Sequence, residues 1–162
     1  PPRSTLFPYT TLFRSIRELA EHSIEGVVRP ENVSISITDD STNPQAMLDI
    51  EQMTQVITNL IKNAIDAMPD GGAIEILLED TLGDVSITIK DSGTGIRDED
   101  KSKIFEPFFT TKGIGQGTGL GLATAYGIVK MHKGQISVES NTDTTRGPTG
   151  TSFKILLPRG KE

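Results

Sequence analysis

The sequence contains no cysteine among its 162 residues, and only 5% of them are aromatic. The absence of cysteine excludes disulfide bonds and thiolate metal sites, and it leaves the redox compartment open. No apolar run is long enough to cross a bilayer. The net charge of −6 argues against a broad nucleic-acid-binding surface, although it allows a local basic pocket for phosphates. The length indicates one domain of ordinary size with a real core.

The first fifteen residues differ in composition from the rest of the chain. They are rich in Pro, Thr, Ser and aromatic residues, and none of them is acidic. They resemble the translation of a common sequencing-adapter oligonucleotide, so we interpret residues 1–15 as a non-native, disordered segment. A disordered natural N-terminus is the alternative. Residues 16–28 have a helical apolar period, and Gly26 and Pro30 mark its end.

Alternating apolar residues predict strands over 32–38, 73–79, 85–90, 135–140 and 151–157, with a short extended piece at 46–48. Two segments have helical periodicity, residues 49–68 and 120–131. Asp49 is the predicted N-cap of the first helix, with Gln52 three residues on as in a capping box. The apolar residues of that helix form one stripe that must face a core: Met53, Val56, Ile57, Leu60, Ile61, Ala64, Ile65 and Met68.

Polar residues of the same helix are also ordered. Asn59, Asn63 and Asp66 are spaced at i, i+4 and i+7 and therefore share one face beside the apolar stripe. Asparagine is a mediocre helix former, so two of them one turn apart are unexpected if only stability matters. The pattern favours a ligand-binding edge, with solvated filler as the alternative.

Two glycine-rich stretches flank a charged, aromatic segment. The first, DSGTGI at residues 91–96, follows an apolar strand, and the second has glycine at positions 113, 115, 117, 119 and 121, directly before a helix. Glycine lets main-chain N–H groups approach a ligand, and a helix N-terminus favours anions, so together they predict a phosphate site. Neither stretch fits the P-loop or the dinucleotide fingerprint. Flexible turns are the alternative for either stretch alone.

Four blocks stand in order along the chain: NLIKNAIDAM (59–68), DSGTGI (91–96), FEPFFTTK (105–112) and GTGLGLA (117–123). In content and order they resemble the N, G1, F and G2 boxes of the catalytic ATP-binding domain of sensor histidine kinases. The wider superfamily includes DNA gyrase B, MutL and the anti-sigma-factor kinases. The short spacer between the last two blocks resembles the nitrogen-regulator (NtrB-like) type, which has a short ATP lid.

This resemblance implies the Bergerat (GHKL) fold, an α/β two-layer sandwich. A mixed, largely antiparallel sheet of about five strands carries helices on one face, with the nucleotide between the helices and the lid. We accordingly assign residues 33–158 to the ATP-binding catalytic domain and residues 159–162 to a tail. Residues 16–32 are interpreted as the remnant of a dimerisation helix and its linker.

The resemblance also implies a set of nucleotide-binding residues. Asp91 is expected to read adenine, because a carboxylate accepts a hydrogen bond from the exocyclic amine and repels O6 of guanine. Thr151 matches a threonine that shares a water with this carboxylate. Asn63 matches the magnesium ligand, since Mg²⁺ prefers hard oxygens and binds jointly to substrate phosphates. The residues expected to bind Mg-ATP are Asn59, Asn63, Asp91, Gly93, Gly95, Ile96, Thr111, Lys112, Gly117, Thr118, Gly119, Leu120, Gly121 and Thr151.

Catalysis is assigned to Asn59, Asn63 and Lys112, because phosphoryl transfer depends mostly on positioning and charge neutralisation. ATP-hydrolysing relatives and anti-sigma-type serine kinases carry glutamate as a general base at the position of Asn59. A neutral amide cannot take a proton from water or serine, whereas neutral imidazole already offers a lone pair. Transfer to histidine is therefore the better fit. The alternatives are a superfamily ATPase or serine kinase, or a non-catalytic nucleotide-sensing module.

The expected partners follow from the same resemblance. The acceptor histidine of the family lies in an upstream dimerisation hairpin, and neither His22 nor His132 matches its motif. The chain is expected to bind Mg-ATP, not to autophosphorylate alone, and to be monomeric and cytoplasmic. A response regulator is expected downstream, and nucleic acid is not expected as a partner.

Overall fold

The computed structural model describes residues 11–112 and 119–160, with side chains from residue 14 onwards. Its centre is a five-stranded sheet in the order β2-β4-β5-β7-β6. The strands are β2 (Val33–Asp39), β4 (Gly72–Asp80), β5 (Asp84–Asp91), β6 (Gln135–Asn141) and β7 (Gly150–Pro158). β2 pairs with β4 in parallel, and every other neighbouring pair is antiparallel. The predicted mixed, largely antiparallel sheet is therefore confirmed.

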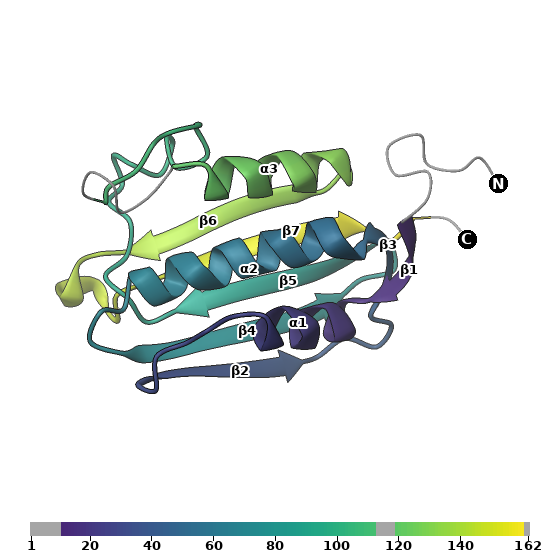
Figure 1. Ribbon diagram of the computed structural model, residues 1–162, viewed down its shortest axis with the longest axis horizontal. Helices are drawn as coiled ribbons and strands as arrows, with labels where there is room; N and C mark the ends of the chain where they lie inside the picture. The colour runs from purple at the N-terminus through teal and green to yellow at the C-terminus, as the bar shows by residue number, and fades with distance from the viewer. Residues whose placement is uncertain (1–10, 113–118, 161–162) are drawn as a thin grey trace.

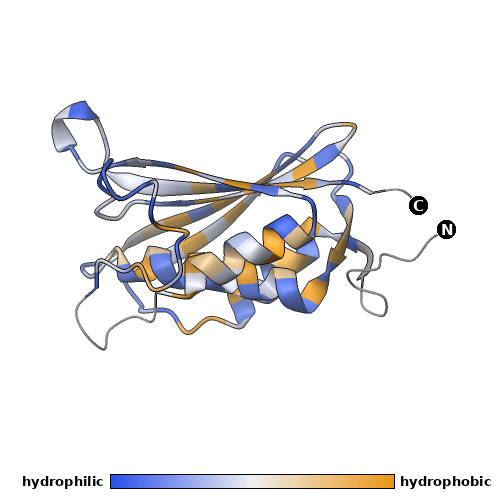
Figure 2. Cartoon of the chain, turned by 90° about the horizontal axis from the view of Figure 1, so that it is seen from above, coloured by the Kyte–Doolittle hydropathy of each residue, from blue (hydrophilic) through white to orange (hydrophobic). Residues whose placement is uncertain are grey.

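Three helices cover one face of this sheet, as Figure 1 shows from the front and Figure 2 shows from above as two layers. They are α1 (Ile16–Glu25), α2 (Ile50–Asp66) and α3 (Gly121–Met131), and α2 lies between the other two. A 3₁₀ turn, Thr144–Arg146, lies in the loop between β6 and β7. Within the described ranges, no helix combines the length and the apolarity that a membrane crossing requires.

The core lies between the helices and the sheet. The apolar stripe of α2 is buried as its period predicts, except that Ile65 is only partly buried. Asp49 caps the helix by accepting a hydrogen bond from Gln52 N at 3.0 Å. Alternate residues of the central strands face the helices, so that Ile76 of β4 lies opposite Ile89 of β5. Burying each such side chain stabilises the fold by about 1.5–3 kcal/mol. The helix that carries the polar edge is thus fixed by its opposite face.

The N-terminal region differs from two of the expectations. Thr11–Ser15 forms β1, which pairs antiparallel with β3 (Gln45–Asp49), whereas residues 1–15 were expected to be disordered. Residues 1–10 lie outside the described residues. The hydroxyl of Ser15 caps α1 by accepting hydrogen bonds from Arg17 N at 3.2 Å and Glu18 N at 3.4 Å. The pairing with β3 and the cap of α1 thus attach residues 11–15 to the neighbouring elements.

Helix α1, in the segment interpreted as a remnant of a dimerisation helix, packs against the same core as the other helices. Ile16, Leu19 and Ala20 are fully buried, and α1 packs on α2. The physical reason is that the apolar stripe of α1 is buried against the same core as that of α2. The core thus extends beyond the expected domain boundary at residue 33, back at least to Ile16.

Arg159, the first residue of the expected tail 159–162, makes several contacts with the fold. Its guanidinium forms an ion pair with Asp80 at 3.1 Å. Backbone N–H groups of Thr42 and Asn43, followed by this guanidinium, lower the pKa of Asp80 to about 2. The guanidinium also donates hydrogen bonds to the backbone carbonyls of Asn43, Gln45, Thr81 and Leu82. Residues 161–162 lie outside the described residues.

Candidate functional site

A cavity of about 490 Å³ opens between the polar edge of α2, the loop after β5, residues 109–112 and the start of α3. Pockets for small molecules commonly have volumes of about 300–1,000 Å³. The cavity unites most of the predicted site residues: Asn59, Asn63, Asp91, Gly95, Ile96, Thr111, Lys112, Gly119, Gly121 and Thr151. Gly93 and Leu120 lie beside it without lining it. Gly117 and Thr118 fall outside the described residues.

The predicted polar edge of α2 forms one wall. Asn59, Asn63 and Asp66 all line the cavity, while the stripe beside them is buried in the core. The amide of Asn59 donates a hydrogen bond through Nδ2 to the carbonyl of Gly121 at 3.2 Å. Asn59 therefore joins α2 to the first residue of α3. This position places the positive end of the α3 dipole at the pocket wall, where it favours anions.

Asp91 is the last residue of β5, and its carboxylate is only 6% exposed. Its Oδ1 accepts hydrogen bonds from Gly93 N at 2.9 Å and from Thr151 N at 3.2 Å. Burial raises the pKa of Asp91, and these two backbone hydrogen bonds oppose the increase. Both hydrogen bonds that the described part of the chain makes to this carboxylate use Oδ1. The second oxygen is therefore the one suited to a ligand.

The loop after β5 depends on two glycines. A Cβ added to Gly93 would lie 2.6 Å from the carbonyl of Ala67, at the end of α2. Gly95 has a φ of +80°, and an added Cβ would lie 2.3 Å from the carbonyl of Asn141. Larger residues would push the loop off α2 and β6. Gly93 thus serves packing against α2, in addition to donating its N–H to Asp91.

Ser140 is a site residue that sequence reasoning missed. Its hydroxyl accepts a hydrogen bond from Ile96 N at 2.7 Å, donates one to Gly150 O at 2.9 Å and lies 2.8 Å from the hydroxyl of Thr151. It fixes the loop after β5 to the strand that carries Thr151. No local sequence signal marks Ser140, because its role depends on the strand register that places it on β6 directly opposite Thr151 of β7.

Two charged residues of the pocket wall were also missed. Asp100 is 5% exposed, and its Oδ2 accepts a hydrogen bond from Nε of Arg97 at 2.9 Å. This hydrogen bond is the main cause of the raised pKa of Arg97. Both residues line the cavity. Consecutive turns between residues 97 and 106 bring them there.

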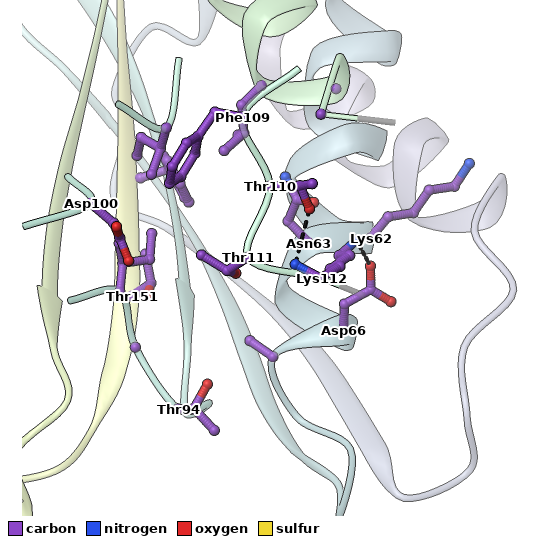
Figure 3. A pocket seen from close by; sticks show the side chains of 18 of the residues that line it. Lys62, Asn63, Asp66, Thr94, Asp100, Phe109, Thr110, Thr111, Lys112 and Thr151 are labelled. Atoms are coloured by element: carbon purple, nitrogen blue, oxygen red, sulfur yellow. Dashed lines mark hydrogen bonds and ion pairs between the residues drawn. The ribbon is translucent and has the colours of Figure 1, made fainter. Parts of the chain in front are cut away.

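Lys112 lies at the edge of the cavity, where its ammonium forms an ion pair with the carboxylate of Asp66 (Figure 3). Both side chains are partly exposed, at 36% and 50%. The predicted contact of Lys112 with phosphate stays a prediction, since the described partner is a carboxylate. The pair connects the last turn of α2 to the end of the segment 105–112, which contains Phe105, Phe108 and Phe109.

The donor set of the cavity fits a nucleotide with magnesium. Among the described residues, no three His, Asp or Glu side chains cluster closely enough to hold a metal by themselves. Asn63 offers an amide oxygen, which is a hard ligand of the kind that Mg²⁺ accepts when substrate phosphates complete its coordination. Asp91, at the buried end of the cavity, offers a carboxylate oxygen that can accept a hydrogen bond from the exocyclic amine of a base.

Residues 48–161 match the family described as histidine kinase-, DNA gyrase B- and HSP90-like ATPase, and the chain belongs to this family. Its relatives place it with the catalytic ATP-binding domains of histidine kinases. Sporulation kinase A of Bacillus subtilis is 43% identical over 111 residues, covering 68% of this chain and 17% of that protein. Sensor histidine kinase ZraS of Escherichia coli is 36% identical over 146 residues, covering 88% of this chain and 30% of that protein.

Solved structures agree. The catalytic domain of histidine kinase ThkA has a TM-score of 0.79 and 32% identity, covering 93% of this chain and 97% of that domain. ThkA has also been solved in complex with the response regulator protein TrrA, where the match has a TM-score of 0.73 and 28% identity and covers 93% of this chain and 42% of that one. The chain spans less than a third of the curated relatives it matches, so it corresponds to one part of those longer proteins.

Proposed function

We propose that this domain binds Mg-ATP in the cavity and transfers the γ-phosphoryl group to a histidine on a dimerisation hairpin of the same full-length kinase. The convergence of Asn63, Asp91 and the start of α3 on one cavity carries the proposal. These elements are far apart in the sequence and supply an amide edge, a buried carboxylate and a helix N-terminus. That combination suits an adenine base at one end and phosphates at the other.

Each side chain has a physical role in this proposal. Asp91 accepts a hydrogen bond from the adenine amine through the oxygen that does not bind Gly93 and Thr151. Asn63 supplies an amide oxygen to magnesium, which would neutralise charge on the phosphates. Lys112 adds a point charge at the edge of the cavity. Gly119, Gly121 and the expected Gly117 and Thr118 contribute main-chain N–H donors.

Asn59 favours histidine as the acceptor over water or serine. Its Nδ2 already donates to Gly121 O, and an amide has no basic site that takes a proton from a hydroxyl group. A neutral imidazole attacks through a lone pair that it already possesses. Asn59 therefore acts as a positioning residue that holds the start of α3 beside Asn63. This reading disfavours a steady ATPase or a serine kinase.

The acceptor histidine is expected to come from outside residues 16–162. His132 is 8% exposed; its Nε2 accepts a hydrogen bond from Asp49 N at 3.0 Å and its Nδ1 lies 2.8 Å from Ile128 O. These contacts assign the Nδ1–H tautomer, and burial lowers the pKa of His132. His22 is exposed on α1 and does not line the cavity. Neither residue suits acceptance.

The remaining partners are proposed from the relatives. A response regulator would take the phosphoryl group in a following step, as the ThkA complex with TrrA suggests by analogy. The isolated domain is proposed to be monomeric and to work in the cytoplasm, where ATP is present. Its net charge of −6 gives no support to nucleic acid as a partner.

The test mixes the domain with the hairpin of its own full-length protein and ATP labelled at the γ-position. We expect acid-labile, base-stable phosphohistidine on the hairpin. Asn63→Ala should abolish transfer, whereas Gln55→Ala, which removes an exposed amide from the same helix outside the cavity, should not. Phosphoserine, or rapid ATP hydrolysis without a phosphorylated hairpin, would replace this function with one of its rivals. Nucleotide binding without either reaction would indicate a sensing module.

A further inference from the structure

The ion pair of Asp66 and Lys112 places a carboxylate where phosphates are expected. Both residues line the cavity, and the pair joins the last turn of α2 to residue 112 (Figure 3). Other carboxylates of the cavity have separate partners: Asp91 has two backbone N–H groups and Asp100 has Arg97. Among the described residues, Asp66 forms its ion pair with Lys112. A ligand that attracts Lys112 therefore removes the partner of Asp66.

The position of Asp66 is electrostatically unfavourable without that lysine. Asp66 is the last residue of α2, where the helix dipole is negative and no basic residue lies in the last turn. Lys62 lies one turn earlier on the same helix, but Figure 3 shows its side chain extending away from the pair. The stability of the helix thus does not explain a carboxylate at this position, whereas the ion pair with Lys112 does.

We propose that Asp66 competes with nucleotide phosphates for Lys112 and thereby lowers the affinity of the cavity for phosphate-bearing nucleotides. This inference rests on the proposed function. When phosphates engage Lys112, Asp66 loses its ion-pair partner, and a ligand with more phosphate charge draws Lys112 away more completely. The penalty increases with ligand charge, so it is largest for ATP, smaller for ADP and absent for adenosine. Asp66 is therefore a specificity-determining residue that makes the site easier to empty.

The proposal predicts a specific pattern of affinities. Asp66→Asn keeps the size of the side chain and removes its charge, so ATP should bind about two- to fivefold more tightly, the range expected for a partly exposed ion pair. The gain for ADP should be smaller, and adenosine should bind as it does to the wild-type protein. The effect should weaken at high salt, because exposed charges are screened. Asp70→Asn removes an exposed carboxylate just beyond the same helix, outside the cavity lining, and is the matched control.

A double-mutant cycle separates competition from simple repulsion. Isothermal titration calorimetry with ATP, ADP and adenosine would compare the wild type, Asp66→Asn, Lys112→Gln and the double variant. We expect the gain from Asp66→Asn to shrink to less than half in the Lys112→Gln background. An equal gain in both backgrounds would show direct repulsion and overturn the proposal. Weaker ATP binding by Asp66→Asn would overturn it in the other direction, by showing that Asp66 aims Lys112 at the phosphates. If the wild type binds neither ATP nor adenosine, the proposed function fails first.

Discussion

Replacing Asp91 with asparagine changes one atom at the buried end of the cavity. The side chain keeps its size, and its carbonyl oxygen can still accept the hydrogen bonds from Gly93 N and Thr151 N. The other oxygen becomes an NH₂ group, which donates instead of accepting. A donor then faces the amine of adenine, so the hydrogen bond that reads the base is lost. The same donor suits O6 of guanine.

The loss of ATP affinity can be estimated from the type of hydrogen bond that is removed. A hydrogen bond to a charged group contributes about 1.5–3 kcal/mol, and about 1.4 kcal/mol corresponds to tenfold in affinity. Asp91→Asn should therefore weaken ATP binding by about 10- to 100-fold and reduce the preference for ATP over GTP by at least about tenfold. The buried position of Asp91 supports the upper part of this range, because little water competes for the bond.

Although Asp91→Asn should bind ATP more weakly, its stability should not fall. Burial raises the pKa of Asp91, so the folded protein binds this proton more tightly than the unfolded chain does. The ionised carboxylate therefore reduces the free energy of unfolding at neutral pH, and the reduction disappears as the pH falls through the folded pKa toward the ordinary value of 3.8. Asp91→Asn should be at least as stable as the wild type at neutral pH. This advantage should shrink near about pH 4.

Calorimetric titration with ATP and GTP, together with urea unfolding at both pH values, would measure these effects. Asp84→Asn is the matched control, because it removes a carboxylate at the opposite end of the same strand. A folded Asp91→Asn protein that binds ATP as tightly as the wild type would refute the assignment of Asp91 to the base. A variant that loses several kcal/mol of stability would refute the pKa argument, because it would show that the carboxylate stabilises the fold.

The remaining predictions concern residues outside the base site. Arg159→Ala should lower the melting temperature by roughly 5 °C, because several backbone carbonyls and Asp80 lose a shared donor; Arg29→Ala, which removes an exposed arginine, should change it little. Burial lowers the pKa of His132, so the contribution of this residue to stability is fully present above the ordinary pKa of 6.5 and is lost as the pH falls below that value. His132→Gln should therefore flatten the dependence of the urea midpoint on pH in that range. An unchanged slope would contradict the prediction. Phe108 has a φ of 67° and is 74% exposed, so Phe108→Gly should not reduce stability in urea unfolding and should retain ATP affinity. Slower phosphoryl transfer to the hairpin would support a contact between Phe108 and the hairpin.

Periodicity and motif order were sufficient for most of the fold and for most of the cavity. The stripe of α2 and the alternation of the strands have direct causes in burial, so their positions in the sequence are informative. The capping of α2 by Asp49 was predictable for the same reason, because the cap needs only local backbone donors. Asn63 and Asp91 were found because each belongs to a block with a recognisable spacing.

The missed residues act through contacts that no local pattern encodes. Ser140 matters because it lies opposite Thr151 in the sheet, which depends on the register of two strands. The pairing of Lys112 with Asp66 depends on a contact between residues 46 positions apart. Helix α1 was assigned to a separate element because its amphipathic period does not reveal which core will bury it. Composition also gives no indication that residues 11–15 pair with β3, because strand pairing depends on a partner distant in the sequence.

Three locally unfavourable features lie at or beside the cavity. Asp91 is a carboxylate whose pKa is raised by burial, Asp66 places a negative charge at the negative end of a helix, and Phe108 has a left-handed backbone. At the opposite end of the sheet, Asp80 shows the reverse, because backbone donors and Arg159 stabilise its charge. Sequences that fold well keep such conflicts for functional sites, since elsewhere substitution would relieve them without loss. Two such features also lie away from the cavity, because Lys133 has a φ of 59° and burial lowers the pKa of His132. The unfavourable features at the cavity therefore agree with the motifs but do not identify the site by themselves.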